Sequence, residues 1–300
     1  MEINCIEVSK SYILKDGIFK KRRIQVLEDI NLDIKQGEIV AIISETSGGK
    51  STLINLLSGG SIPDSGVVLV DGINDSKTLN KNCSVIKSLN NKLLINESVY
   101  NNLVYFGKKM NMSEFDIEKR IVDLKNVLDF EKNINSKVNQ LNDISLAKAN
   151  LAVYLMNSPS FIFVDDVLSR LNPINKMTIL KDLRRVNKEF KTTIIVASGD
   201  ISDVEKICKR VIFLNGGRIV IDDNFEAIKK EYLSHKIISI TFNKSFNLPK
   251  GDFSIIENSE YFVMIELDFN KCDFATLINQ FDINTIVDIE INSASIKSII

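Results

Sequence analysis

The stretch that most constrains this 300-residue sequence is SETSGGKST, at residues 44–52. An apolar run from Ile39 to Ile43 precedes it, and the segment from Lys50 to Leu57 has helical spacing. A strand, a glycine-rich turn and a helix in this order direct backbone N–H groups and a helix N-terminus toward an anion. From Gly49 onward the stretch fits the phosphate-binding pattern G-x-x-x-x-G-K-S/T, but Ser44 stands where the first glycine is expected. We therefore predict a phosphate site with one departure from its pattern.

The side chains of this loop have distinct expected roles. Lys50 would reach the outer phosphates of a nucleotide, and the Ser51 hydroxyl would hold magnesium. If the position of Ser44 needs a left-handed backbone, the replacement of glycine costs about 1 to 2 kcal/mol, so affinity would fall without vanishing. The alternative is a turn rich in serine and glycine that only begins a helix. The residues expected to hold phosphate are Ser47, Gly48, Gly49, Lys50, Ser51 and Thr52.

Short apolar runs alternate with helix-like segments through most of the chain, which predicts an α/β domain. Asn215-Gly216-Gly217 lies between two such runs and predicts a hairpin. Residues 98–140 are polar with helical spacing, so we expect a helical insertion at about 98–145 in a nucleotide-binding domain that spans 1–230. The predicted strands lie at 39–43, 67–70, 161–164, 193–197 and 210–214.

The pattern changes after about Tyr232. The segments IISITFN, YFVMIELDF and TIVDIEI alternate as half-buried strands do, and the helix-like DFATLINQF precedes the last of them. We therefore expect residues 231–300 to form a small α+β accessory domain.

Charge and cysteine usage limit the partners and the compartment. The 38 basic and 39 acidic residues leave a formal net charge of -1, which predicts no long-range field that would gather nucleic acid or anionic lipid. The four cysteines are far apart and form no C-x-x-C pair, so a reduced, cytoplasmic setting is expected. The N-terminus MEINCIEVSK has no apolar secretory core, and no run approaches the roughly 20 apolar residues of a membrane span.

Several motifs identify a family resemblance. FIFVDDVLSRLNP at 161–173 resembles the strand, paired acids and loop of ATP-binding-cassette (ABC) ATPases, and TTIIVASGD at 192–200 resembles their next strand. VLEDINLDIKQGEIVAII and RVIFLNGGRIVIDDN extend the resemblance over about residues 1–230. It implies an ABC-type P-loop NTPase fold that binds ATP and Mg²⁺. Tyr12 would stack on adenine, and Ser51 with Asp165 would hold the metal.

The tail INSASIKSII resembles the end of an accessory domain on the ATPase subunits of exporters, of the drug, antibiotic and lantibiotic type. The resemblance therefore also implies a membrane permease as partner. It implies a peripheral position on the inner face of the cell membrane, and a homodimer or a heterodimer with a second ABC ATPase.

Two positions that serve hydrolysis in the family differ here. The residue after Asp165 should be a glutamate that polarises the attacking water, and Asp166 is one methylene shorter. General-base catalysis is worth about 10² to 10⁴ in rate and depends on reach, so much of that factor is at risk. The family's switch histidine aligns with Gly199, and the single histidine, His235, comes far later in the chain. The alternative for Asp166 is that it merely ends a strand.

The family's signature loop aligns with Leu141 to Ser145, of which only the leucine is kept. Asp143 would bring a carboxylate to a phosphate, and two charges about 4 Å apart repel by about 4 kcal/mol at an effective dielectric of about 20. Folding offers another explanation, because Asn142 or Asp143 is a good N-cap for the helix that follows. Ser88 or Leu89 replaces the family's glutamine, and Asn172 replaces an aspartate.

These motifs predict an ABC ATP-binding subunit that binds Mg-ATP with weak or lost hydrolysis. One alternative is a scaffold or regulator that no longer binds nucleotide and pairs with an intact ABC subunit. The other is an active transporter ATPase with atypical motifs.

Overall fold

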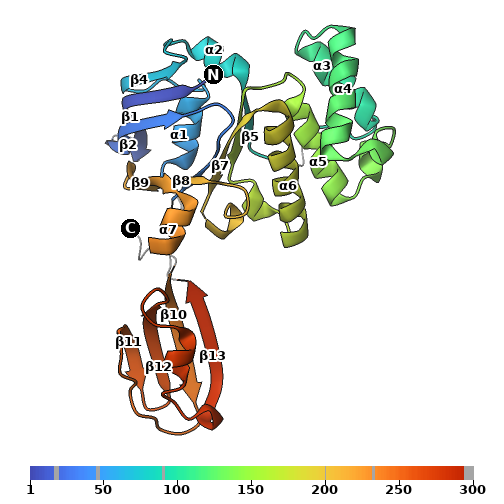
Figure 1. Cartoon of the computed structure of the whole chain (residues 1–300). Coiled ribbons are helices and arrows are strands. Elements are labelled where there is room, and N and C mark those ends of the chain that lie inside the picture. Colours follow the sequence, from blue (N-terminus) through green and yellow to red (C-terminus); the bar gives the residue numbers. More distant parts are fainter. Residues whose placement is uncertain (17–19, 45–47, 90–91, 200, 232–233, 294–300) are drawn as a thin grey trace. The chain divides into compact units, whose positions relative to one another are not determined.

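The computed structural model describes all residues except 17–19, 45–47, 90–91, 200, 232–233 and 294–300. The chain divides into two compact units, Met1–Asp222 and Asp223–Ile300 (Figure 1). The expected boundary was residue 230, eight residues further along the chain than the observed division. None of the described helices is long and apolar enough to cross a membrane.

A six-stranded sheet forms the centre of the first unit. Its strand order is β5-β6-β7-β3-β8-β9, and the pairs β5–β6, β6–β7, β7–β3 and β3–β8 are parallel. Strands β6 and β7 are buried along their whole length, which explains their continuous apolar sequences. The strands are β3 (Ile39–Ile43), β5 (Cys83–Ile86), β6 (Phe161–Asp165), β7 (Thr193–Ser198), β8 (Arg210–Asn215) and β9 (Arg218–Asn224).

The strands predicted from the sequence are confirmed, and so is the hairpin between β8 and β9. Gly216 and Gly217 both have positive φ in this hairpin. A Cβ on Gly217 would lie 2.4 Å from the Val26 carbonyl oxygen, so the hairpin packs closely against the backbone of a second sheet. The fold is the α/β fold that the motifs predict.

The second sheet of this unit is antiparallel, in the order β2-β1-β4. It contains β1 (Ile3–Asp16), β2 (Lys20–Ile34) and β4 (Ser65–Val70). The pairing of β1 with β4 ends at Ser9 opposite Ser65, whereas its pairing with β2 continues to Asp16 opposite Lys20. Strands β1 and β2 therefore extend beyond β4 as a two-stranded hairpin.

Helices pack around these sheets, and most begin at a capping side chain. Ser98, Ser113, Asn142 and Asn172 each accept a hydrogen bond from the backbone three residues later. Helices α3 and α4 form the expected helical insertion with α5 beside them (Figure 1). The helices are α1 (Lys50–Leu57), α2 (Ser76–Asn82), α3 (Val99–Lys109), α4 (Glu114–Leu128), α5 (Asp143–Leu155) and α6 (Pro173–Phe190).

A buried arginine holds the helical insertion to the rest of the unit. Arg120 of α4 donates two hydrogen bonds, from Nε and Nη2, to the Leu155 carbonyl at the end of α5, at 3.0 and 2.8 Å. Its guanidinium also lies 4.1 Å from the ring centroid of Phe190. The carbonyl of a last-turn residue lacks an intrahelical partner, and the Leu155 carbonyl also accepts from the Ser158 N–H at 3.1 Å. The arginine contact fixes α4 on the end of α5.

The second unit is a four-stranded antiparallel sheet in the order β11-β12-β10-β13. Alternate residues of β10 and β12 are buried, among them Ile238, Ile240 and Ile265, and Leu277 packs against them. The three predicted strands are present. The fourth, β11, was not predicted, because it is mostly exposed and a register shift between Ile255 and Glu257 breaks its alternation. The elements are α7 (Phe225–Glu231), β10 (His235–Phe242), β11 (Phe253–Ser259), β12 (Phe262–Asp268), α8 (Phe274–Ile278) and β13 (Ile286–Ser293).

Candidate functional site

The predicted phosphate loop joins the end of β3 to the start of α1. Gly49 is the N-cap of α1, with φ 93°, and no side chain caps the helix. The N–H groups of the first turn of α1 therefore face the loop, as an anion site requires. Residues 45–47 lie outside the described part of the chain, so the predicted role of Ser47 has no structural description. Gly48 and Thr52 are half-buried beside this helix start.

Glycine is required at position 49 for two reasons. Its left-handed backbone disfavours any residue with a Cβ. A Cβ would also lie 2.8 Å from Leu27 Cδ2 and 3.0 Å from the Val26 carbonyl oxygen. The phosphate loop is thus seated directly on β2 of the antiparallel sheet.

Lys50 is buried and turns back into the loop. Its Nζ donates hydrogen bonds to the Ser44 carbonyl at 2.8 Å and to the Ser44 hydroxyl at 3.1 Å. Ser44 is not among the described residues with positive φ, so the left-handed cost considered for its replacement of glycine does not arise. The serine hydroxyl instead gives the lysine an additional partner, which the sequence motif did not indicate.

The charge of Lys50 depends on its neighbours. Burial lowers the pKa of Lys50 below its usual value, and the nearby charges of Asp166 and Asp165 oppose that shift. These two carboxylates therefore lie close enough to act on the lysine. The loop and the paired acids that the sequence separates by more than a hundred residues form one site.

Ser51 and Asp165 meet at the carboxyl ends of the parallel strands. The Ser51 hydroxyl donates to Asp165 Oδ1 at 2.8 Å, and Asp165 is the last residue of β6. Mg²⁺ prefers oxygen ligands and binds through one or two carboxylates together with phosphate oxygens. The described residues contain no cluster of three or more His, Cys, Asp or Glu side chains that could hold a metal. One hydroxyl and one carboxylate are too few ligands for a metal ion on their own. The pair therefore fits a magnesium ion whose other ligands include nucleotide phosphate oxygens.

Asp166 has an exposed side chain and a left-handed backbone, with φ 55°. Its N–H donates to the Ala197 carbonyl at 3.2 Å, and the Ser169 hydroxyl donates to its carbonyl at 3.0 Å. Aspartate tolerates this conformation better than most residues with a Cβ. The aspartate at the place of the family's glutamate is therefore compatible with the left-handed backbone at position 166.

Gly199 directly follows β7 and lies near the phosphate loop. A Cβ at this position would be 3.9 Å from the Ser44 carbonyl oxygen, an ordinary contact distance, so a side chain could begin here without a clash. The chain's single histidine belongs to the second unit. Its Nδ1 lies 3.3 Å from Glu266 Oε1 and its Nε2 lies 3.7 Å from Asp268 Oδ2.

Several positions that differ from the family begin helices in the structure. Asn142 Oδ1 accepts from the Ser145 N–H at 2.9 Å, which confirms the expected cap of α5. Asp143 is in the first turn of that helix, where a negative charge is favourable. Asn172 caps α6 in the same way. Of the two residues that could stand at the place of the family's glutamine, Ser88 is half-buried and Leu89 is buried.

Tyr12, the predicted adenine platform, lies on β1 opposite Ile24 and is 39% exposed. Lys10 Nζ is 5.9 Å from the centroid of its ring. Asp64 fixes this part of the strand, because it accepts hydrogen bonds from Lys10 and from both the N–H and the hydroxyl of Ser11. These bonds hold the pKa of Asp64 well below its usual range. The turn Pro63-Asp64 was visible in the sequence, but its role beside Tyr12 was not.

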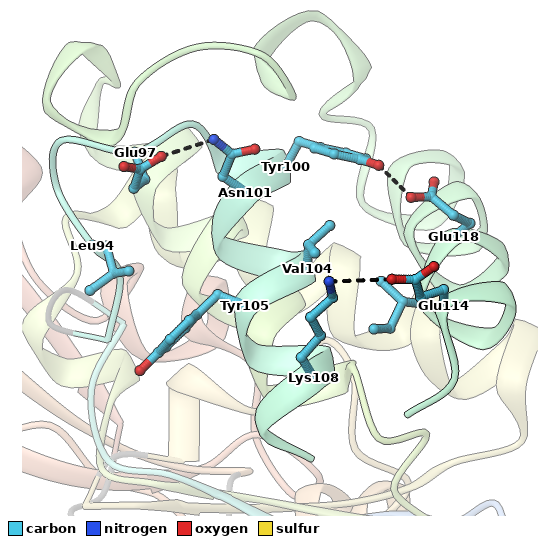
Figure 2. Close-up of a pocket in the computed structure, with 10 residues that line it drawn as sticks. Leu94, Glu97, Tyr100, Asn101, Val104, Tyr105, Lys108, Glu114 and Glu118 are labelled. Atoms are coloured by element: carbon cyan, nitrogen blue, oxygen red, sulfur yellow. Dashed lines mark hydrogen bonds and ion pairs between the residues drawn. The ribbon is translucent and has the colours of Figure 1, made fainter. Parts of the chain in front are cut away.

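A separate cavity of about 630 Å³ opens along α3 and α4 (Figure 2). We call it the α3–α4 groove. Tyr100 donates a hydrogen bond to Glu118, and Lys108 forms an ion pair with Glu114 at 3.3 Å, so polar contacts join the two helices along one wall. The remaining lining residues are Leu94, Glu97, Asn101, Val104, Tyr105 and Ile117.

The geometry of the first unit defines a P-loop nucleotide-binding domain. Comparison with known proteins specifies the class further. Residues 27–169 match the ABC transporter family. The chain is 30% identical over 253 residues to the energy-coupling factor transporter ATP-binding protein EcfA2 of Clostridium perfringens, which covers 78% of this chain and 89% of that protein. It is 29% identical to the methionine import ATP-binding protein MetN 1 of Oceanobacillus iheyensis, with 77% and 71% covered.

Solved structures agree with this assignment. The structure of cbiO1 from Clostridium perfringens, part of the ABC transporter complex cbiONQ, matches with a TM-score of 0.68 and 26% identity, over 76% of this chain and 90% of that one. A dimeric ATP-binding cassette in a post-hydrolysis state, bound to ADP and Pi, matches with a TM-score of 0.60 and 25% identity, over 74% and 98%. The chain belongs to the ATP-binding proteins of the ABC transporter family.

The seat of the phosphate loop generates a first prediction. The Gly49→Ala variant should weaken binding of a fluorescent ATP analogue by about tenfold or more, because the new methyl group forces the loop away from β2. Gly72→Ala is the matched control, since Gly72 also has positive φ but a Cβ there would meet nothing within 4 Å. Both variants should lose about 1 kcal/mol or more of stability in thermal denaturation, whereas only the first should lose nucleotide. Equal affinity in the two variants would contradict the assignment.

Proposed function

We propose that this chain is the cytosolic ATP-binding subunit of an ABC transporter, docked on a membrane permease, and that it binds Mg-ATP with weak or lost hydrolysis. The observation that carries the proposal is the contrast between two halves of one site. Lys50 is bonded to Ser44 of the loop and Ser51 to Asp165, whereas Asp166 is one methylene shorter than glutamate and position 199 has no side chain. The residues that would bind the nucleotide are kept, and those that would activate water are shorter or missing.

In this proposal each retained group acts on the nucleotide. The main-chain N–H groups from Gly48 to Ser51 donate to the phosphates. Lys50 gives up its hydrogen bonds to Ser44 and pairs with the phosphate charge instead. Ser51 and Asp165 hold Mg²⁺, which withdraws charge from the phosphate oxygens. Tyr12 offers a partly exposed ring for the adenine. Binding energy then favours the closed arrangement of two such subunits without turnover.

Hydrolysis needs a base within hydrogen-bond reach of the attacking water. Asp166 is shorter than glutamate, and no imidazole follows β7. Since general-base catalysis supplies about 10² to 10⁴ of rate, the proposed turnover lies below the usual range of about 1 s⁻¹ or more. In the proposed dimer the partner is a second copy or a different ABC ATPase. Any ATP site to which this chain contributes Asp166 and Gly199 then has the same weakness in hydrolysis.

One observation favours the scaffold or regulator instead. Lys50 is already bonded to both the carbonyl and the hydroxyl of Ser44, so phosphate must compete with two hydrogen bonds for the same ammonium group. In that case the chain would persist for its interfaces and leave nucleotide binding to an intact partner. The expectation of an exporter subtype rests on the tail INSASIKSII, most of which lies outside the described residues, and the relatives compared above are named for energy-coupling and import.

We place the permease contact in the α3–α4 groove. Leu94 and Tyr105 present exposed apolar surface there, and the carboxylates of Glu97, Glu114 and Glu118 surround it with only Lys108 of opposite charge. An apolar segment flanked by basic residues complements this lining. The occupant we assign to the groove is such a segment of the permease.

Nucleotide binding is tested by titrating a fluorescent ATP analogue in magnesium. The wild-type chain should bind saturably, and Lys50→Ala should lose at least about tenfold in affinity, because a buried charge that pairs with phosphate is removed. Lys188→Ala, an exposed lysine at the end of α6, should bind as the wild type does. Identical flat curves for wild type and Lys50→Ala would establish the scaffold.

Hydrolysis is tested by steady-state phosphate release, with the chain alone and with its membrane partner. The wild type should turn over below about 1 s⁻¹, and the double variant Asp166→Glu with Gly199→His should gain at least about tenfold, since it restores both the reach of the base and the imidazole. Lys50→Ala added to the double variant should abolish the gain. Brisk release by the unaltered chain would refute the proposed loss.

Permease docking is tested by the share of the chain that co-purifies with the permease from detergent-solubilised membranes of its source cells, where no lipid surface remains to bind the chain. Leu94→Asp should reduce that share by about tenfold or more, because it places a charge in the apolar part of the groove. Val122→Asp is the control, since Val122 is similarly exposed on α4 but does not line the groove. An equal loss in both variants would move the contact elsewhere.

A further inference from the structure

The part of the β1–β2 hairpin beyond Ser9 is not accounted for by the nucleotide site. The pairing with β4 ends at Ser9, and past it the described residues of β1 and β2 pair only with each other. Within this part Ile13 lies opposite Arg23 and Leu14 lies opposite Arg22. Since side chains alternate along a strand, Leu14 and Arg22 share one face of the hairpin and Ile13 and Arg23 share the other.

Large apolar side chains are exposed on both faces. Ile13 is 66% exposed and Leu14 is 53% exposed, each beside a cation of the opposite strand. A single exposed aliphatic residue on a protein surface is ordinary, but here two successive residues of β1 leave apolar surface on both faces of the hairpin. Contact with a partly apolar surface would remove these aliphatic side chains from water, which is favourable.

Charge is concentrated in the same segment. Residues 10–25 contain six Lys or Arg and one Asp, a net charge of +5, so the rest of the chain carries -6 to give the total of -1. Asp64 compensates Lys10 and Arg23, at 2.8 and 3.7 Å. Lys21 and Arg22 are exposed farther along the hairpin. The balanced total charge, which predicted no attraction to anionic lipid, conceals a local excess of positive charge.

We propose that the β1–β2 hairpin beyond Ser9 binds the anionic headgroups of a phospholipid surface. Lys21 and Arg22 pair with the headgroup phosphates, and Ile13 and Leu14 enter the boundary between headgroups and acyl chains. Basic and aliphatic side chains together are the combination that binds a charged membrane surface. The proposed permease docking explains only why a bilayer is near. The lipid contact itself depends on the hairpin alone.

The hairpin also carries Tyr12, two residues before Leu14 and on the same face. A lipid surface that holds Leu14 in place therefore also holds the strand that presents the adenine platform. The proposal also gives a role to the net charge of +5 in residues 10–25 of a chain whose other residues sum to -6.

The experiment measures sedimentation of the full chain with protein-free vesicles. The wild type should sediment with equal parts of phosphatidylcholine and phosphatidylglycerol, should remain in solution with phosphatidylcholine alone, and should be released by high salt. Lys21→Ala with Arg22→Ala should weaken binding by about tenfold or more, since each cation near the surface contributes about fivefold. Ile13→Ser with Leu14→Ser should also weaken it. Lys132→Ala with Lys137→Ala, which removes two exposed lysines elsewhere in the same unit, should bind as the wild type does.

Equal sedimentation of the hairpin variant and the lysine control would overturn the proposal, as would binding that ignores the vesicle charge. Absence of sedimentation for the wild type would also overturn it and would favour an acidic protein as the partner of the hairpin. Because the vesicles contain neither nucleotide nor permease, this result is separate from the proposed function. The fluorescent ATP titration of the same variants reports whether the nucleotide site is intact.

Discussion

The structure depends on where the buried parallel strands end. Strands β3, β6 and β7 are paired in parallel, so Ser44, Asp165 and Gly199 come to one edge of the sheet. The chain can reverse from β3 into α1 at this edge only because Gly49 takes a left-handed backbone and fits against Leu27. One close contact between a glycine and the second sheet thus fixes the loop, the helix that follows it and the place of the lysine.

Much of this arrangement could be predicted from the sequence, because the information was local. The strands of the parallel sheet are continuous apolar runs, and the cap at Asn142 follows from its side chain and the helical spacing after it. Long-range contacts could not be predicted in this way. The bonds from Arg120 to the Leu155 carbonyl and from Ser11, beside Tyr12, to Asp64 join residues whose proximity only the fold determines. Strand β11 was missed because its register shift removes the alternation that identifies a strand.

Three positions that depart from the family have a place in the fold. Asn142 and Asn172 are the N-caps of α5 and α6, and Asp166 is an aspartate in a conformation that aspartate tolerates. A cap contributes to stability whether or not the helix behind it faces a nucleotide, so these residues serve the fold independently of any role at the nucleotide site.

The contact of Arg120 with the Leu155 carbonyl has a mechanical consequence. Two hydrogen bonds join α4 to the end of α5, and the Arg120 guanidinium over the Phe190 ring joins α4 to the end of α6. In α3, a Cβ on Gly107 would lie 2.6 Å from Ile117 of α4, so these two helices are in close contact. These contacts tie the wall of the α3–α4 groove to α5, the helix whose first turn begins at Asn142. The groove and the position of the family's signature loop are therefore linked through directly packed helices.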